Sequence, residues 1–276
     1  MLYDHVEIAC QDYDRAINHY NIVQYSEALD CYQKDCAIYG QISPMADEKT
    51  AQLYCDTAMN YLGIGQYNEA LLYFEKGLAI YEQILLPTDQ KLAYLYFYIG
   101  DTHNKLKQYD KALLYLEKSQ DIYKQLLPPT SDEWASIYLA LADVNNGLGQ
   151  YDEALIYYEK CRPIYERIVP PTDRALADLY YMIGNTYNRA KKYKEALDYY
   201  EKCLPIYKQV LPEEKGAFAQ LYKEMAVMLS YLSRHSEAIV YIEKCLDIIT
   251  KILPPDDPSL QETFLMRKIM LGKLKD

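Results

Sequence analysis

The stretch YDEALIYYEK at residues 151–160 decides the fold, because related stretches recur at a fixed interval along the chain. They read YSEALDCYQK, YNEALLYFEK, YDKALLYLEK, YKEALDYYEK and HSEAIVYIEK, and they begin at residues 25, 67, 109, 193 and 235. The alanine at the fourth place of each stretch is followed by the next one 42 residues later, without a slip. An unbroken period of this length is typical of a solenoid, in which each repeat packs only against its neighbours.

Composition limits the classes of function open to this chain of 276 residues. The formal net charge of −11 disfavours a general nucleic-acid grip, because phosphate binding needs clustered lysine and arginine. No apolar run is long enough to span a membrane, and the first residues do not read as a signal segment. Seven cysteines without a CxxC pair, beside only four histidines, indicate reduced thiols. We therefore expect a cytoplasmic protein that needs no cofactor and binds neither nucleic acid nor membrane.

Each repeat is predicted to hold two amphipathic helices, helix A and helix B. With the central alanine numbered as position 20, apolar residues recur at positions 4, 7, 8 and 11, and again at 20, 21, 24, 27, 28 and 31. Each set is spaced for one helical face. In the third repeat the two helices run near 90–106 and 109–126, and Pro128 ends the second. Position 8 is always glycine or alanine, so we expect the two helices to approach closely there.

Three further residue types carry structural predictions. Pro163 and Pro205 fall inside helix B of the fourth and fifth repeats, where we expect kinks and not helix ends. Tyrosines at positions 4, 17, 24 and 31 share the packing phase, so we assign them to the core and not to a surface that stacks on bases. Cys161, Cys203 and Cys245 recur at position 27, too far apart to share a metal ion, and we expect them to be small buried fillers.

One more helix is predicted after the sixth repeat, over residues 258–274. Ser259 and Glu262 stand at the spacing of a capping box, which would open this helix. Its apolar residues keep the register of a helix A, so we expect it to cover the last repeat. Other faces of the helix also carry apolar residues, namely Leu265, Met266 and Ile269. Self-assembly through this terminal helix is therefore one hypothesis.

These positions resemble the tetratricopeptide repeat pattern: aromatic at 4, 11, 17 and 24, small at 8 and 27, and alanine at 20. The period of 42 residues and the loop PPDDPSLQ at 254–261 are similar to the kinesin light chain subclass. The resemblance implies an all-α fold, a right-handed superhelix of six helix pairs plus the terminal helix, whose A helices line a concave groove for peptides or protein segments. We place the repeats within a single domain over residues 1–276, at about 9–44, 45–87, 88–129, 130–171, 172–212 and 213–255.

The chain departs from known members of the family at positions that determine their specificity. Kinesin light chains resemble one another in carrying asparagine at positions 5 and 6 of several A helices, whereas the third repeat here has Phe97 and Tyr98. The clamp of chaperone-binding members needs lysine at position 5 and asparagine at position 9 of one repeat. Here Lys223 and Asn185 hold these positions in different repeats. We carry neither specificity over to this chain.

Positions 2, 5, 9 and 12 of helix A lie on one stripe beside the packed stripe, and they are the candidate binding residues. They are Tyr94, Phe97, Asp101 and Asn104; Ser136, Leu139, Asp143 and Asn146; and Asp178, Tyr181, Asn185 and Asn188, with Arg189 and Lys223 nearby. Asparagine can pair with the backbone of an extended peptide, aromatic rings can anchor apolar side chains, and the carboxylates favour a basic residue in the ligand. The alternative is that these are solvated groove residues hydrogen-bonded to neighbouring helices.

We expect a non-catalytic protein-interaction module or scaffold that binds a peptide or partner segment in the groove lined by the A helices. The sequence holds no glycine-rich phosphate loop, no nucleophile elbow and no histidines at metal-ligand spacing. An alternative from another class is a regulatory or sensing arm of a larger multidomain enzyme or assembly.

Overall fold

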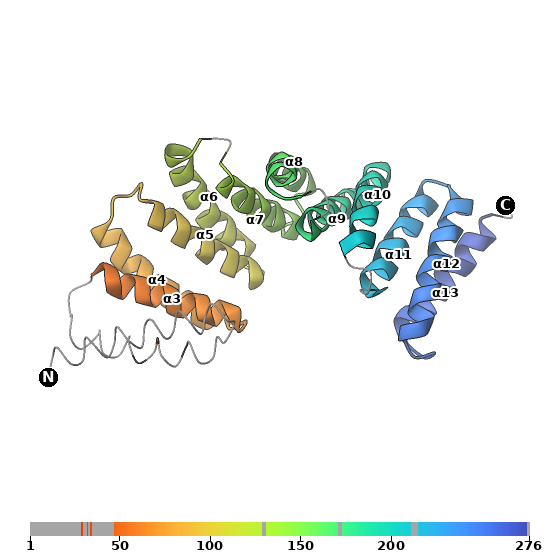
Figure 1. The fold of residues 1–276 in the computed structure, drawn as a ribbon, viewed down its shortest axis with the longest axis horizontal. Coiled ribbons are helices and arrows are strands. Elements are labelled where there is room, and N and C mark those ends of the chain that lie inside the picture. The colour runs from red at the N-terminus through yellow and green to blue at the C-terminus, as the bar shows by residue number, and fades with distance from the viewer. Residues whose placement is uncertain are drawn as a thin grey trace. The chain divides into compact units, whose positions relative to one another are not determined.

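The computed structural model describes residues 47–128, 131–170, 173–210 and 215–274, together with Leu29, Tyr32 and Lys34. Within these ranges eleven helices follow one another, and no strand occurs between them (Figure 1). The predicted first repeat, over residues 9–44, lies outside the described part of the chain apart from those three residues.

Along the chain the described helices succeed one another as five pairs of helix A and helix B, followed by one further helix. Helix A of each pair is, in order, α3 (Glu48–Gly63), α5 (Gln90–Lys105), α7 (Glu133–Gly147), α9 (Arg174–Arg189) and α11 (Lys215–Tyr231). Helix B is α4 (Tyr67–Ile84), α6 (Tyr109–Leu126), α8 (Tyr151–Ile168), α10 (Tyr193–Val210) and α12 (His235–Ile252). The last helix is α13 (Pro258–Gly272). The predicted solenoid of helix pairs with a terminal helix is confirmed, and α5 and α6 match their predicted ranges to within one residue.

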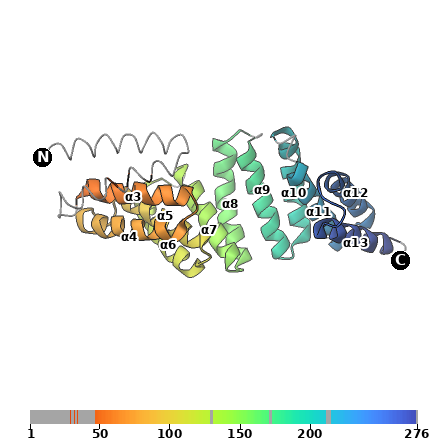
Figure 2. The ribbon, with the colours of Figure 1, turned by 90° about the horizontal axis from the view of Figure 1, so that it is seen from below.

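The chain divides into two compact units, unit 1 over residues 1–148 and unit 2 over residues 149–276. In unit 1, α3 packs against α4 and α5 against α6, while α4 also contacts α5 and α6 contacts α7 (Figure 2). In unit 2, α9 packs against α10 and α11 against α12, with α8, α10 and α12 each contacting the helix that follows. The prediction that residues 1–276 form a single domain stays a prediction.

The turn from helix A to helix B has the same backbone geometry in each described repeat. Its central residue, at position 15, has a positive φ between 58° and 78°: Gly65, Lys107, Gly149, Lys191 and Ser233. Glycine adopts this conformation freely, whereas lysine or serine does so at a cost of roughly 1–2 kcal/mol. In the second repeat the following amide, that of Gln66, donates back to the carbonyl of Tyr61 at 2.8 Å and closes the turn.

The small residue at position 8 brings the paired helices together, as predicted. A methyl group on Gly100 of α5 would lie 2.8 Å from Leu116 of α6, and one on Gly184 of α9 would lie 2.6 Å from the ring of Tyr200 in α10. Both separations are too short for carbon atoms, so larger residues at these positions would force the helices apart. The alanine at position 20 has no exposed surface in any described repeat.

The cores of both units follow the predicted packing phase with one correction. Tyr158 and Tyr200 at position 24 are completely buried, whereas tyrosines at position 17, such as Tyr109, are only half-buried. Position 17 opens helix B, and its ring lies against the end of the next helix A, as Tyr193 stacks on Tyr231 of α11 with ring centres 4.3 Å apart. The thiols at position 27 are buried as expected, and no group of acidic, cysteine or histidine side chains in the described ranges could hold a metal ion.

Both internal prolines lie where continuous helices were predicted. Pro163 is inside α8 and Pro205 is inside α10, and each helix continues beyond its proline. Among the described helices, none combines the length and the apolar character that crossing a membrane requires.

The terminal helix α13 begins in a different way from the predicted capping box. Its N-cap is Asp257, whose carboxylate accepts from the backbone amide of Ser259 at 2.8 Å, and Pro258 is its first residue. Ser259 is therefore already inside the helix, because a proline with its fixed φ is favoured at the first helical position. Glu262 does not close a capping box and instead pairs with Lys223 of α11 at 2.5 Å. Leu265 and Ile269 are exposed.

Candidate functional site

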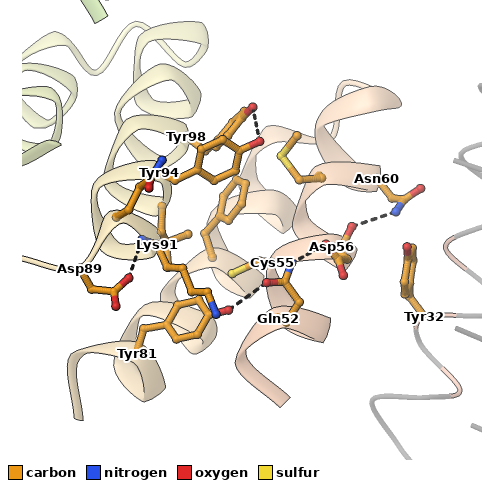
Figure 3. Close-up of a pocket in the computed structure, with 14 residues that line it drawn as sticks. Tyr32, Gln52, Cys55, Asp56, Asn60, Tyr81, Asp89, Lys91, Tyr94 and Tyr98 are labelled. Carbon is orange, nitrogen blue, oxygen red and sulfur yellow. Dashed lines mark hydrogen bonds between the residues drawn. The ribbon is translucent and has the colours of Figure 1, made fainter. Parts of the chain in front are cut away.

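A cavity of about 720 Å³ lies in unit 1 between α3, α4 and α5. Cys55 and Met59 of α3 line it, together with aromatic side chains: Tyr32; Phe74 and Tyr81 of α4; and Tyr94 and Tyr98 of α5 (Figure 3). The residues from α3 and α5 stand at positions 2, 5, 6 and 9 of helix A or close to them. The cavity therefore opens on the stripe that the sequence singled out for binding.

Hydrogen bonds fix the side chains along the α3 wall of the cavity. The hydroxyl of Tyr81 donates to Gln52 Oε1 at 3.0 Å, and Gln52 Nε2 donates to Asp56 Oδ1 at 2.9 Å (Figure 3). On the opposite wall, the hydroxyls of Tyr94 and Tyr98 lie 2.8 Å apart and share one hydrogen bond. The walls are therefore held in place by contacts within each repeat, which limits the entropy lost when a ligand binds.

The cavity is acidic and its thiol is unreactive. Asp56 and Asp89 contribute two carboxylates to the lining, and Lys91 contributes one ammonium that pairs with Glu48 of α3. Burial, assisted by the negative charge of Asp56, raises the pKa of Cys55 to about 12. The Cys55 thiol therefore stays protonated at neutral pH, and nucleophilic chemistry needs the thiolate.

Among the candidate residues chosen from the sequence, Tyr94 is the one that lines this cavity. Its ring is about half exposed, and it meets the ring of Tyr98 edge-on at 4.5 Å. The ring centres of Phe97 and Tyr98 lie 5.3 Å apart, and Asp101 and Asn104 follow further along α5. Burial raises the pKa of the Asp101 carboxyl, and Lys105 at 3.9 Å partly offsets this effect.

In unit 2, the predicted polar residues of α9 are bonded to neighbouring helices. Asp178 accepts from the hydroxyl of Tyr207 at 2.5 Å, and Asn185 Oδ1 accepts from the hydroxyl of Tyr200 at 2.7 Å. Asn188 donates to Glu224 of α11 at 3.4 Å. These contacts are of the kind that the alternative interpretation of the stripe predicted. Binding of a ligand by these residues stays a prediction.

The other predicted residues are distributed over both units. Leu139, Asp143 and Asn146 are half-buried on α7 of unit 1. In unit 2, Tyr181 packs its ring 5.9 Å from that of Tyr200. Arg189 is exposed at the end of α9, and Lys223 is engaged by Glu262.

Sequence reasoning missed most of the cavity residues, because it considered the stripe only from the third repeat onward. Gln52, Cys55 and Met59 hold positions 2, 5 and 9 of the second repeat, so the same register points to them. The useful signal was the size of the residue at position 5. Cys55 is small, whereas Phe97 and Tyr181 fill the same position in the third and fifth repeats.

The family to which the chain belongs is shown by its repeats. The tetratricopeptide repeat family model matches residues 49–125 and 133–209, and a second tetratricopeptide repeat model matches residues 219–259. The chain therefore belongs to the tetratricopeptide repeat family. This fold supports a protein-interaction scaffold in general terms, and its members are generally non-catalytic. No curated protein matches the chain.

Solved structures share the fold at low sequence identity. One of them holds TPR-like repeats of a kinesin light chain from Podosopora anserina, which are nearly identical to one another. It is 18% identical to this chain, with a TM-score of 0.61 over 73% of this chain and 96% of that one. BtubC (BKLC) from P. vanneervenii is 16% identical, with a TM-score of 0.63 over 93% and 95% of the two chains. A signal transduction ATPase from Pyrococcus horikoshii with a tetratricopeptide repeat sensor is 18% identical, with a TM-score of 0.63 over 93% and 36%.

Proposed function

We propose that this protein is a non-catalytic scaffold that binds an extended segment of a partner along its A helices, with the unit 1 cavity as the main anchoring point. The observation that carries the proposal is the cavity itself, which is lined by Tyr94 and Tyr98 at positions 2 and 6 of α5 and by Cys55 at position 5 of α3. Most of the energy of a protein interface commonly comes from a few aromatic or arginine anchors in well-packed pockets.

The chemistry of the cavity supports binding and not catalysis. A thiol with a pKa near 12 is a poor nucleophile, and the remaining lining offers rings, amides and carboxylates that the fold holds in place. A cavity of about 720 Å³ also lies within the range of sites that enclose a ligand group.

Selected peptides provide the test. Peptides from a random displayed library would be selected on the immobilised chain, and their affinities measured for the unmodified chain and for Tyr94→Ala. Because Tyr94 is 52% exposed, removing its ring costs little stability, yet we expect the affinity to fall by tenfold or more. Tyr231→Ala is the matched control, since Tyr231 is 61% exposed on α11 and does not line the cavity. Equal affinities for both variants would refute the anchoring role of the cavity.

The second hypothesis, a regulatory or sensing arm of a larger enzyme or assembly, would use the same surface. The signal transduction ATPase from Pyrococcus horikoshii carries such a tetratricopeptide repeat sensor. That likeness concerns the fold, so the hypothesis for this chain stays a prediction. Self-assembly through α13 is likewise a prediction, which light scattering at high protein concentration would test.

A further inference from the structure

The last helix of unit 2, α13, exposes apolar side chains along one side (Figure 1). It packs against α12, and its residues Thr263 and Met270 are buried. By contrast, Phe264, Leu265 and Ile269 are 43%, 57% and 51% exposed. The spacing of these three residues places them on one broad face of the helix, away from the buried ones. This face of α13 is therefore apolar and open to solvent.

Basic residues accompany the apolar face. Residues 263–275 contain four lysine or arginine residues and no acidic residue, although the net charge of the chain is −11. Lys268 and Lys273 are exposed, and neither ammonium has an ion-pair partner in the described part of the chain. Arg267 pairs with Glu243 of α12 at 2.5 Å. The net charge led us to expect no membrane contact, but it does not describe this helix.

The corresponding face of the other A helices of unit 2 packs on a helix B. Positions 7 and 8 of α9 and α11 hold a buried apolar residue and a buried small one, which are Ile183 with Gly184 and Met225 with Ala226. In α13 the same positions are Arg267 and Lys268. Charged groups cannot enter such a close, dry contact without a large loss of hydration. The face of α13 therefore suits a surface that takes apolar and cationic groups together.

The size of this face favours a lipid surface over a protein partner. A stable protein interface buries about 800 Å² on each side, and one stripe of a single helix offers only part of that area. A helix that lies in a bilayer interface needs no more than its own apolar stripe, which enters about 5–10 Å into the headgroup boundary. Lysine side chains on such a stripe bury their stems and keep their ammonium groups among the headgroups.

We infer that α13 docks the chain on an anionic lipid surface. Phe264, Leu265 and Ile269 enter the interface, and Lys268 and Lys273 meet the anionic headgroups. The helix lies on the bilayer, and no helix in the described ranges could cross it. This inference goes beyond the proposed function and does not depend on it, because the anchoring cavity is lined by residues of unit 1 alone.

Vesicle flotation of the full chain tests the inference. Vesicles of phosphatidylcholine alone are compared with vesicles of an equimolar mixture of phosphatidylcholine and phosphatidylserine. We expect binding to the mixed vesicles and an affinity at least about tenfold lower for the neutral ones, because basic residues near an anionic surface are attracted to it. Added salt should weaken the binding to the mixed vesicles, since it screens this attraction.

Two double variants separate the charged contact from the apolar one. Lys268→Glu with Lys273→Glu reverses the exposed cations, and Leu265→Ser with Ile269→Ser removes exposed apolar side chains. All four side chains are exposed, so both variants should keep the circular dichroism spectrum of the unmodified chain. We expect each to lower the affinity for the mixed vesicles by about tenfold or more.

A third double variant is the matched control for net charge. Lys191→Glu with Lys194→Glu changes the net charge of the chain by the same amount as the α13 lysine variant. Both lysines are exposed near the start of α10, two repeats before α13. We expect an affinity within about twofold of the unmodified chain, because the attraction of a charge to the surface falls off within a Debye length.

The outcomes decide between a lipid surface and other occupants of this face. Equal binding to both kinds of vesicle, or full binding by the α13 lysine variant, would overturn the inference. Absence of vesicle binding by the unmodified chain would also overturn it. A dimer in light scattering that is lost in Leu265→Ser with Ile269→Ser would then assign the face to a second copy of the chain. Tyr94→Ala should bind vesicles like the unmodified chain, so this inference and the proposed function can fail separately.

Discussion

Corresponding surfaces of the two units use the same helix register in opposite ways. In unit 1, Cys55 at position 5 of α3 leaves room for a cavity that Tyr94 and Tyr98 of α5 border. In unit 2, Tyr181 holds position 5 of α9 and packs against Tyr200. The comparison teaches that the repeat fixes how helices pack, whereas a few positions outside the packing stripe decide whether the surface leaves a cavity.

The next helix A, which is α5 in unit 1 and α11 in unit 2, differs as clearly between the two units. Positions 2, 5 and 6 are Tyr94, Phe97 and Tyr98 in α5, and they are Gln220, Lys223 and Glu224 in α11. The polar residues of α11 bond to one another and to neighbouring helices, since Gln220 donates to Glu224 at 2.7 Å and Lys223 pairs with Glu262. In unit 1 the hydroxyls of Tyr94 and Tyr98 also bond to each other, but their rings border a cavity.

The largest expected effect is on stability, when the small residue of unit 1 is placed in unit 2. Tyr181→Cys removes a half-buried ring that packs on Tyr200, and we expect it to lower the free energy of unfolding by about 2–3 kcal/mol. Urea denaturation followed by circular dichroism measures the loss. A loss below about 0.5 kcal/mol, the range of ordinary surface substitutions, would mean that Tyr181 does not fill space as we describe.

A smaller loss of stability is expected when the hydrogen-bond acceptors at position 2 of helix A are removed. Asp178→Ala removes the charged acceptor of the Tyr207 hydroxyl, and Gln52→Ala removes the neutral acceptor of the Tyr81 hydroxyl. Hydrogen bonds to charged groups are worth more, so we expect losses of about 2 kcal/mol in unit 2 and about 1 kcal/mol in unit 1. The reverse order in denaturant titrations would show that the bond to Asp178 is not the stronger one.

The smallest effect concerns Glu224, at the position that Tyr98 holds in unit 1. Burial raises the pKa of its carboxyl, opposed by the hydrogen bond from Gln220 and by Lys223. A carboxyl whose pKa is raised in the folded state destabilises the fold when it is charged. This destabilisation grows as the pH rises above the ordinary pKa of 4.5. Glu224→Gln should therefore raise the melting temperature at pH values near neutrality, and the gain should vanish in acid.

Glu237 offers a control of opposite sign for this pH dependence. The Arg234 guanidinium bonds to it and holds the pKa of its carboxyl below the usual range. The stabilisation is present above the ordinary pKa and is lost as the pH falls, so Glu237→Gln should lower the melting temperature at neutral pH. Parallel behaviour of the two variants would contradict our account of the Glu224 environment.

Much of the fold followed from the sequence because the 42-residue period repeats the same packing residues. Gly100 and Gly184 could be assigned to the close contact between paired helices before the contact was seen. The first residue of α13 could not be assigned in this way. Asp257 caps the helix and Pro258 begins it, although Ser259 and Glu262 have the spacing of a capping box. The periodic pattern sets which face is buried, whereas local caps depend on single residues.

The sequence predicted the helix positions that form the candidate stripe, but it did not predict where along the chain a cavity would form. Position 2 was offered as a binding position, yet Asp178 serves as the acceptor for Tyr207, which lies 29 residues later on another helix. Such a contact depends on the geometry between helices, and spacing along one helix does not contain it. Likewise, the cavity depends on Cys55 being small while Tyr94 and Tyr98 face it from the next repeat.

The central claim is that the partner is anchored in unit 1 and not in unit 2. Its most direct test is the affinity of one selected peptide for the unmodified chain, Cys55→Tyr and Tyr181→Cys, measured by calorimetry on folded protein. Cys55→Tyr gives unit 1 the residue that unit 2 already holds at position 5, and we predict a loss of tenfold or more. Tyr181→Cys should change the affinity less than about twofold, within the small effect of residues outside an energetic centre. Full affinity in Cys55→Tyr, with a tenfold loss in Tyr181→Cys, would contradict the account.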